Sequence, residues 1–116
     1  MDRSPITTHI LDTQSGKPAN GVNVTLSVQE NSCWKALGQG ITDSDGRINR
    51  LIKDDIGACA PHGIYQLTFD VKEYFESQSQ KCFFPKVQLT FEVCEKRHYH
   101  VPLLLSPYSY TTYRGS

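Results

Sequence analysis

The feature that most constrains the fold of this chain is a two-residue alternation of apolar and polar side chains that recurs along it. In the segment 22–28 four apolar residues alternate with three polar ones, and the segments 65–71 and 87–94 show the same period. Alternation of this kind is typical of a strand with one buried face and one solvated face. The sequence therefore predicts many short strands packed as a β-sandwich or barrel.

Turn-forming residues separate these strands at positions 15–18, 43–46 and 60–63. The segment 71–80 is the only candidate helix, and it is short. A chain of 116 residues buries roughly two-thirds of its unfolded surface, which is enough for one core. We therefore expect a single all-β domain, residues 1–116, with one short helix.

Charge and hydropathy exclude several classes of partner. Lys and Arg number 12 and Asp and Glu number 12, so no basic excess indicates a nucleic-acid partner. No apolar run approaches the ~20 residues of a membrane span. The first residues of the chain lack the apolar stretch of a signal peptide. We therefore expect neither a nucleic-acid partner nor a membrane partner.

The four cysteines are widely spaced, which disfavours a zinc ribbon or a redox pair. They are Cys33, Cys59, Cys82 and Cys94. In a secreted chain they would form two disulfides, whereas in a reducing compartment they would remain free. We expect four free thiols.

The alternation fails in the run after His100, where residues 101–105 are all apolar. Both faces of such a strand need to be covered. In a two-layer sandwich one face meets the core, and the other has only another subunit to meet. His98 and His100 lie on that second face because residues two apart in a strand share a face. The sequence thus predicts histidines at the margin of a subunit interface.

Four basic side chains are candidates for chemistry. His9 lies in the first expected strand, on the same face as Thr7, and Arg47 follows the turn at 43–46. A lone strand histidine is usually structural, and an arginine after a turn is usually solvated. His98 and His100 are suited to binding a metal as neutral imidazoles, but two histidines without a third ligand are a weak metal signal.

Five motifs occur in a fixed order: SPITTHILDTQSGKPA, TDSDGR, FFPKVQLTF, HYHVPLLLSP and the terminal YRGS. Together they resemble the transthyretin-related 5-hydroxyisourate hydrolases, over almost the whole chain from Ser4 to Ser116. The terminal YRGS after HVPLLLSP is highly specific to that family. Transthyretin itself, a thyroid-hormone carrier on the same fold, lacks the histidine, arginine and YRGS positions present here. The resemblance therefore favours the hydrolase over the carrier.

The resemblance implies a transthyretin-like β-sandwich of two four-stranded sheets with one short helix. It also implies a homotetramer, built as a dimer of dimers around a central channel. The catalytic residues that it implies are His9, Arg47, His98, His100 and Ser116. The substrate-binding residues that it implies are His9, Arg47, Tyr113, Arg114 and Gly115.

The implied reaction is the hydrolysis of 5-hydroxyisourate at a cyclic amide bond, which gives 2-oxo-4-hydroxy-4-carboxy-5-ureidoimidazoline in urate degradation. Such a reaction needs a base for the water, stabilisation of the carbonyl oxygen and a proton for the leaving nitrogen. We assign the base to His100 or His9, with the other as orienter or acid. The charged planar fork of Arg47 suits the carbonyl oxygens, and Tyr113 suits substrate positioning. The hydroxyl and carboxylate of Ser116 would add acceptors beside the histidines.

Two other classes of function compete with this one. A transthyretin-type carrier would hold a flat aromatic ligand in the channel, and a histidine-cluster metal protein would hold a metal ion. Some members of the family carry zinc on the histidines, but we expect no metal and no cofactor in the reaction. The resemblance and the free thiols indicate a peroxisomal or cytoplasmic location.

Overall fold

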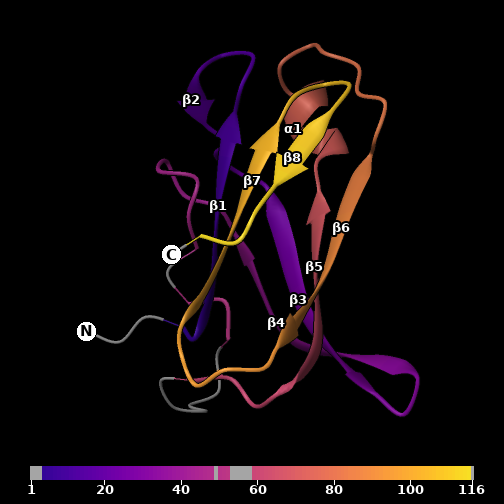
Figure 1. The fold of residues 1–116 in the computed structure, drawn as a ribbon. Helices are drawn as coiled ribbons and strands as arrows, with labels where there is room; N and C mark the ends of the chain where they lie inside the picture. Colours follow the sequence, from indigo (N-terminus) through magenta and orange to yellow (C-terminus); the bar gives the residue numbers. More distant parts are fainter. Residues whose placement is uncertain (1–3, 49, 53–58, 116) are drawn as a thin grey trace.

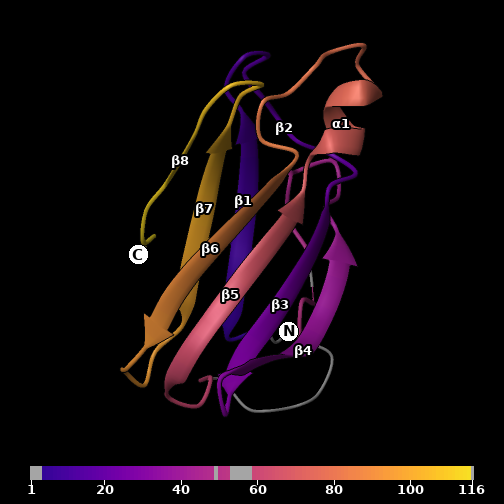
Figure 2. The ribbon, with the colours of Figure 1, turned by 90° about the vertical axis from the view of Figure 1, so that its right-hand side faces the viewer.

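The computed structural model describes residues 4–48, 50–52 and 59–115 and is a β-sandwich of two four-stranded sheets (Figures 1 and 2). The first sheet has the order β2-β1-β7-β8, and the second has the order β4-β3-β5-β6. The elements are β1 (Ile6–Asp12), β2 (Lys17–Pro18), β3 (Asn23–Glu30), β4 (Cys33–Ile41), β5 (Gly63–Asp70), α1 (Lys72–Glu76), β6 (Lys86–Val93), β7 (Tyr99–Leu105) and β8 (Tyr110–Thr112). The expected fold class is confirmed.

The first sheet is built on the parallel pairing of β1 with β7, which lie far apart in the sequence. The register places Thr7 opposite His100 and His9 opposite Pro102. In Figure 2 this sheet forms one layer of the sandwich, and the C-terminal segment runs along its outer side. Because paired residues point to the same face, the register brings Thr7 and His100 to one surface.

The alternation in the sequence decides which face of each strand is buried. In β1, Ile6, Thr8, Ile10 and Asp12 are buried, whereas Thr7, His9 and Leu11 are only partly so. In β7, His100 and Leu104 are half-buried, and the other five residues are buried. The inner residues join a core with the apolar positions of β3, β5 and β6. His9 and Thr7 therefore share the outer face of the first sheet, as the sequence predicts.

The helix is shorter than the expected segment 71–80, because α1 covers only Lys72–Glu76. It buries Tyr74 and Phe75, and the residues that follow offer no further apolar side chain to bury. The chain then reverses at Ser79, which has a φ of 58°, and the N–H of Gln80 donates to the carbonyl of Phe75 at 2.9 Å. The polar run 77–80 therefore forms a turn that ends the helix instead of extending it.

Strand β4 is not signalled by alternation, because most of its residues are exposed and two are glycines. At Gly38 the carbonyl of Leu51 occupies the place of a Cβ, and at Gly40 the side chain of Ile48 approaches closely. These glycines let Ile48 and Leu51 lie directly against the strand. The strand is thus defined by close backbone packing and by its antiparallel ladder with β3.

Two further features concern the cysteines and the hydropathy of the chain. All four cysteines, at positions 33, 59, 82 and 94, are free thiols. No helix in the described part of the chain is long and apolar enough to cross a membrane.

Candidate active site

Several of the residues singled out in the sequence lie on the outer face of the first sheet. Thr7 and His9 project from β1, His100 projects from β7, and His98 immediately precedes β7. The loop after β4 brings Arg47 alongside His9, and the C-terminal tail, defined as residues 113–115, brings Gly115 alongside His100. Four separate segments therefore meet on one surface of a single chain.

The turn 43–47 holds Arg47 beside β1. The carboxylate of Asp43 accepts the N–H groups of Asp45 at 2.9 Å and Arg47 at 3.1 Å, which closes the turn. The carbonyl of Gly46 then accepts the N–H of Ile10 at 2.9 Å. His9 and Arg47 form an antiparallel bridge, so both side chains leave from the same face. The position of Arg47 is thus set by main-chain contacts.

Gly46 also lies close to the His9 imidazole. Its φ of +73° lies in the left-handed region that glycine adopts without strain. A Cβ at this position would come 3.3 Å from His9 Cδ2 and would also collide with the carbonyl oxygen of Ile10. The His9 imidazole therefore packs against the backbone of the turn, which limits its orientations.

Thr7 links His100 of β7 to His98, which immediately precedes that strand. Its Oγ1 lies 2.8 Å from His98 Nε2 and 2.8 Å from His100 Nδ1. All three side chains are partly buried, so the hydroxyl bridges two imidazoles away from bulk water. Thr7 was not among the residues predicted for the site. What identifies Thr7 as part of the site is its position opposite His100, and this position is known only once β1 and β7 are paired.

The C-terminal tail packs onto the same face. The N–H of Gly115 donates to the carbonyl of His100 at 2.8 Å, and the two residues form an isolated bridge. A Cβ on Gly115 would lie 2.7 Å from His100 Cδ2, so the imidazole fills the space that a side chain would need. Gly115 therefore lies directly against His100, and its role in binding substrate stays a prediction. Ser116, predicted as catalytic, lies outside the described residues.

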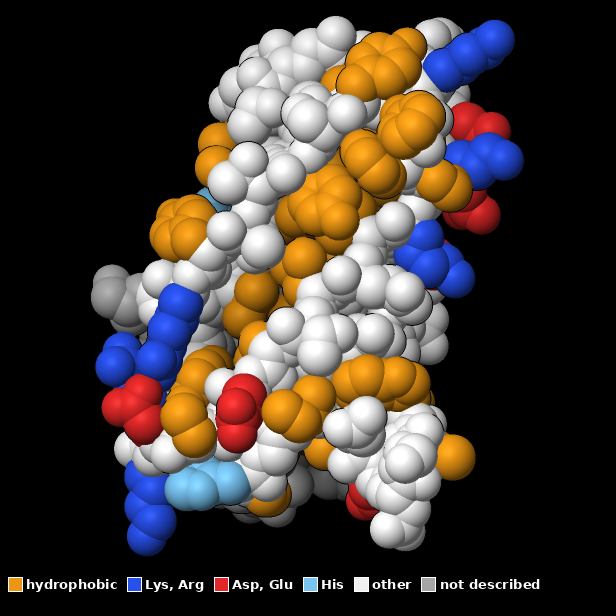
Figure 3. Space-filling model, turned by 45° about the vertical axis from the view of Figure 1, so that its right-hand side comes forward, with side chains coloured by type: hydrophobic (Ala, Val, Ile, Leu, Met, Phe, Trp, Pro, Cys, Tyr) orange, Lys and Arg blue, Asp and Glu red, His pale blue; other side chains and the backbone are white. Residues whose placement is uncertain are grey.

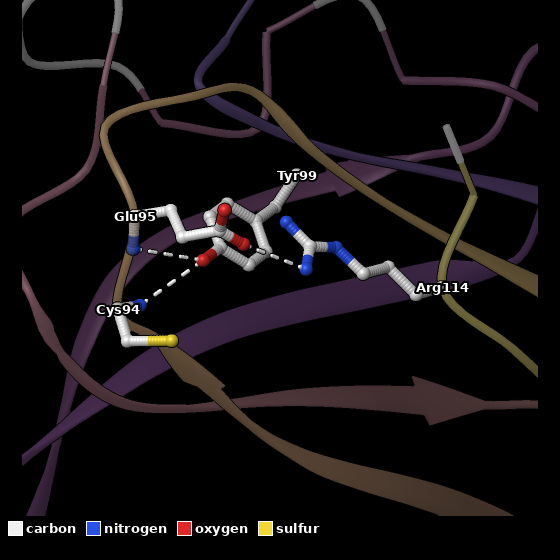
Figure 4. Close-up of polar contacts among 4 residues, drawn as sticks. All are labelled: Cys94, Glu95, Tyr99 and Arg114. Atoms are coloured by element: carbon white, nitrogen blue, oxygen red, sulfur yellow. Dashed lines mark hydrogen bonds and ion pairs between the residues drawn. The ribbon is translucent and has the colours of Figure 1, made fainter.

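Arg114 anchors the tail at a distance from the histidines (Figure 4). Its Nη1 donates to Glu95 Oε1 at 3.0 Å, and its guanidinium lies 4.4 Å over the ring of Tyr99. The hydroxyl of Tyr99 in turn accepts the N–H groups of Cys94 at 3.0 Å and Glu95 at 3.1 Å. The hydrogen bond to Glu95 raises the pKa of Arg114. Arg114 thus holds the tail, and its role as a substrate-binding residue stays a prediction.

Tyr113 points to a different surface from the histidines. Together with Leu89, Phe91 and Val101 it lines a groove of about 380 Å³ between β6 and the tail. Figure 3 shows hydrophobic side chains gathered along this groove, between the open edges of the two sheets. In the single chain Tyr113 is 57% exposed. The structure therefore brings together His9, Arg47, His98, His100 and Gly115, and leaves Tyr113 at the margin.

This arrangement suits acid–base chemistry on an oxygen-rich substrate. Imidazoles exchange protons near neutral pH, and the guanidinium of Arg47 offers a permanent charge with several donors. Among residues 4–48, 50–52 and 59–115, no group of three or more His, Cys, Asp or Glu residues is placed to hold a metal ion. The site therefore offers two kinds of group, proton carriers and a fixed cation.

Known proteins resemble this chain over nearly its whole length. The HIUase/Transthyretin family matches residues 6–115. The chain is 47% identical to the 5-hydroxyisourate hydrolase of Salmonella dublin over 112 residues, which cover 96% of this chain and 80% of the relative. The solved 5-hydroxyisourate hydrolase of Klebsiella pneumoniae is 34% identical, with a TM-score of 0.81 over 96% of this chain and 92% of that one. Sea bream transthyretin in complex with thyroxine is also 34% identical, with a TM-score of 0.88 over 97% and 95%.

Proposed function

Because the chain belongs to the HIUase/Transthyretin family, we propose that it hydrolyses 5-hydroxyisourate and that the outer face of the first sheet is its active site. The enzyme opens the ring of this substrate at a cyclic amide bond, and the product is 2-oxo-4-hydroxy-4-carboxy-5-ureidoimidazoline. One observation carries the assignment of the site. His9, Arg47, His98 and His100 come from three separate segments, and all lie toward the outer face of the first sheet.

The reaction divides among these residues as follows. Either His100 or His9 takes a proton from water, and the resulting hydroxide adds to the amide carbonyl carbon. The negative charge that develops on the carbonyl oxygen is stabilised by the guanidinium of Arg47. The ring C–N bond then breaks, and the protonated imidazole returns its proton to the leaving nitrogen. The proton count closes, because one water is consumed and no proton is left on the enzyme.

The direct test of this function is the ultraviolet decay of 5-hydroxyisourate freshly made from urate and urate oxidase. The protein is expected to accelerate the decay, and Arg47→Gln is expected to lower kcat/KM by about 10²–10³-fold, as the loss of an oxyanion donor does. A matched control is Arg97→Gln, an exposed arginine on the loop between β6 and β7. Equal losses in both variants, or no acceleration by the wild type, would contradict the assignment.

The alternative is a carrier of a flat aromatic ligand, since sea bream transthyretin shares the fold and was solved with thyroxine. The cluster of histidines with Arg47 favours the enzyme, because a carrier has no use for groups that exchange protons. Thyroxine binding without any acceleration of 5-hydroxyisourate decay would favour the carrier.

For assembly we propose the homotetramer built as a dimer of dimers. β6 and β8 each form one edge of their sheet, and all three residues of β8 are exposed. Open edges attract pairing with another chain, and the apolar groove between them adds area to bury. The outer face of the first sheet is then available for a second contact that would enclose the substrate and exclude water. Light scattering coupled to size exclusion tests this, and a monomer at assay concentration would contradict it.

For location we propose the peroxisome or the cytoplasm. The four free thiols support a reducing compartment. Fractionation of the source cells tests this, and recovery from a secreted fraction would contradict it.

A further inference from the structure

The hydroxyl of Thr7 occupies an unusual position between two imidazoles. Its Oγ1 contacts His98 Nε2 and His100 Nδ1, both at 2.8 Å, and β1 and β7 hold it there through the Thr7–His100 register. Thr8, the next residue, faces the other way and donates its hydroxyl to the carbonyl of Val101. The two threonines therefore serve different faces of the same strand.

A threonine hydroxyl carries one proton, so Thr7 donates to only one of the two imidazoles at a time. If Thr7 donates to His98 Nε2, then His100 Nδ1 must carry the proton and donate to Oγ1. The neutral His100 ring then has no proton on Nε2, and this nitrogen is able to accept one. If Thr7 donates to His100 Nδ1 instead, the proton of neutral His100 is on Nε2, which then cannot act as a base. The hydroxyl thus couples the tautomers of the two histidines.

We propose that Thr7 is a positioning residue that donates to His98 and thereby holds His100 in the tautomer with Nδ1 protonated and Nε2 ready to act as the base. This inference rests on the proposed function, and it chooses His100 over His9 as the base. When Nε2 takes the proton of the water, the imidazolium donates from Nδ1 to Oγ1, and the Thr7 hydroxyl still donates to His98. No further proton moves, and the imidazolium keeps an acceptor for its second N–H.

The charged and titratable groups around His100 are few in the described part of the chain. His98 adjoins it on the approach to β7, and His9 and Arg47 share its face from β1 and the turn 43–47. Gly115 contacts the ring without a charge, and Arg114 is held by Glu95. The hydrogen bond with Thr7 favours the charged form of His100, whereas Arg47 opposes it. Removal of the hydroxyl is therefore expected to move the acid limb of the pH–rate profile to lower pH.

The kinetic test compares three variants. Thr7→Val keeps the shape of the side chain and removes the hydroxyl. We expect kcat/KM to fall by about 10- to 100-fold, because the base remains but is no longer held in one tautomer. Thr7→Ser restores a hydroxyl and is expected to recover activity to within about threefold and to return the acid limb to its wild-type pH. Thr8→Val is the matched control, because it removes a hydroxyl bonded to β7 on the opposite face. It should destabilise the fold without moving the pH profile.

The decisive readout is the tautomer of His100, measured by long-range ¹H–¹⁵N NMR of the imidazoles and assigned with His98→Asn and His100→Asn. The wild type should show neutral His100 protonated at Nδ1, and Thr7→Val should lose that preference. A wild-type His100 protonated at Nε2, or a tautomer unchanged in Thr7→Val, would overturn the inference even in a fully active enzyme. The expected tautomers in a protein that fails to accelerate 5-hydroxyisourate decay would instead contradict the proposed function.

Discussion

Gly115 and His100 are joined by a main-chain hydrogen bond of 2.8 Å, and the imidazole of His100 lies where a side chain at position 115 would have to be. Gly115, from the C-terminal tail, thus lies directly against one side of the His100 ring. A glycine is required here because of the close approach of the ring, without any need for a left-handed backbone.

Gly115→Ala tests this contact. The added Cβ would come 2.7 Å from His100 Cδ2, so either the tail or the ring must move. We expect kcat/KM to fall by at least about tenfold, since small displacements of a catalytic group cost orders of magnitude in rate. Thr111→Ala, on exposed β8, is the control and should retain activity. The unfolding midpoint should change little, and wild-type kinetics in Gly115→Ala would show that the contact is irrelevant to catalysis.

The anchor of the tail gives a second prediction. Arg114→Ala removes the ion pair with Glu95 and the stacking on Tyr99. Exposed pairs of this kind contribute little to stability, so we expect only a small loss of unfolding free energy. We expect a larger effect on activity, several-fold in kcat/KM, because the tail that contacts His100 is loosened. Chemical denaturation and the ultraviolet assay measure the two effects.

Two companion variants separate the parts of this anchor. Glu95→Gln removes only the charge of the partner, and Arg114→Lys keeps the charge but loses the planar surface that lies over Tyr99. If stacking dominates, Arg114→Lys will resemble Arg114→Ala, and Glu95→Gln will resemble the wild type. Full activity in Arg114→Ala would mean that the tail does not depend on this anchor.

Buried Asp12 and Tyr74 predict an alkaline limit to stability. Tyr74 donates to Asp12 Oδ2 at 2.7 Å, and burial together with this bond raises its pKa from 10.0 to about 12. A phenol with a raised folded-state pKa stabilises the fold fully below pH 10, and that stabilisation is lost between about pH 10 and 12. Tyr74→Phe should cost roughly 1–3 kcal/mol at neutral pH by leaving part of the Asp12 carboxylate without its partner.

The measurement is urea unfolding of wild type and Tyr74→Phe at one protein concentration, at pH 7 and at steps up to pH 12. The difference in free energy between the two should shrink as the pH rises past 10. Tyr108→Phe, an exposed tyrosine, is the control and should track the wild type. A difference that stays constant to pH 12 would contradict the linkage.

The sequence predicts β3, β5 and β6 because apolar and polar residues alternate in their segments. In β1 the two-residue period of a strand puts Thr7 and His9 on one face, and the burial of Ile6, Thr8 and Ile10 makes that face the outer one. Strand β4 is not predicted because Gly38 and Gly40 interrupt any alternation of apolar and polar residues. These glycines are needed where Leu51 and Ile48 of the same chain pack closely. The predicted helix is too long, because the Ser and Gln residues at 77–80 favour a turn after the last apolar side chain of the helix.

The sequence predicts which residues belong to the candidate site, but not that they lie close together. His9, Arg47, His98 and His100 follow from the motifs, but their proximity depends on the parallel pairing of β1 with β7 and on the bridge between His9 and Arg47. These are contacts between distant segments, which local patterns do not encode. Thr7 is missed for the same reason, since a threonine on a half-exposed strand position is typical of any sheet surface.

The central claim is that the imidazole of His100, on the outer face of the first sheet, performs the proton transfer that opens the ring. His100→Asn keeps a similar size but cannot exchange a proton near neutral pH, and its kcat in the ultraviolet assay tests the claim most directly. We predict a fall of about 10²–10⁴-fold with the fold and assembly intact. A kcat within a few-fold of the wild type would contradict it.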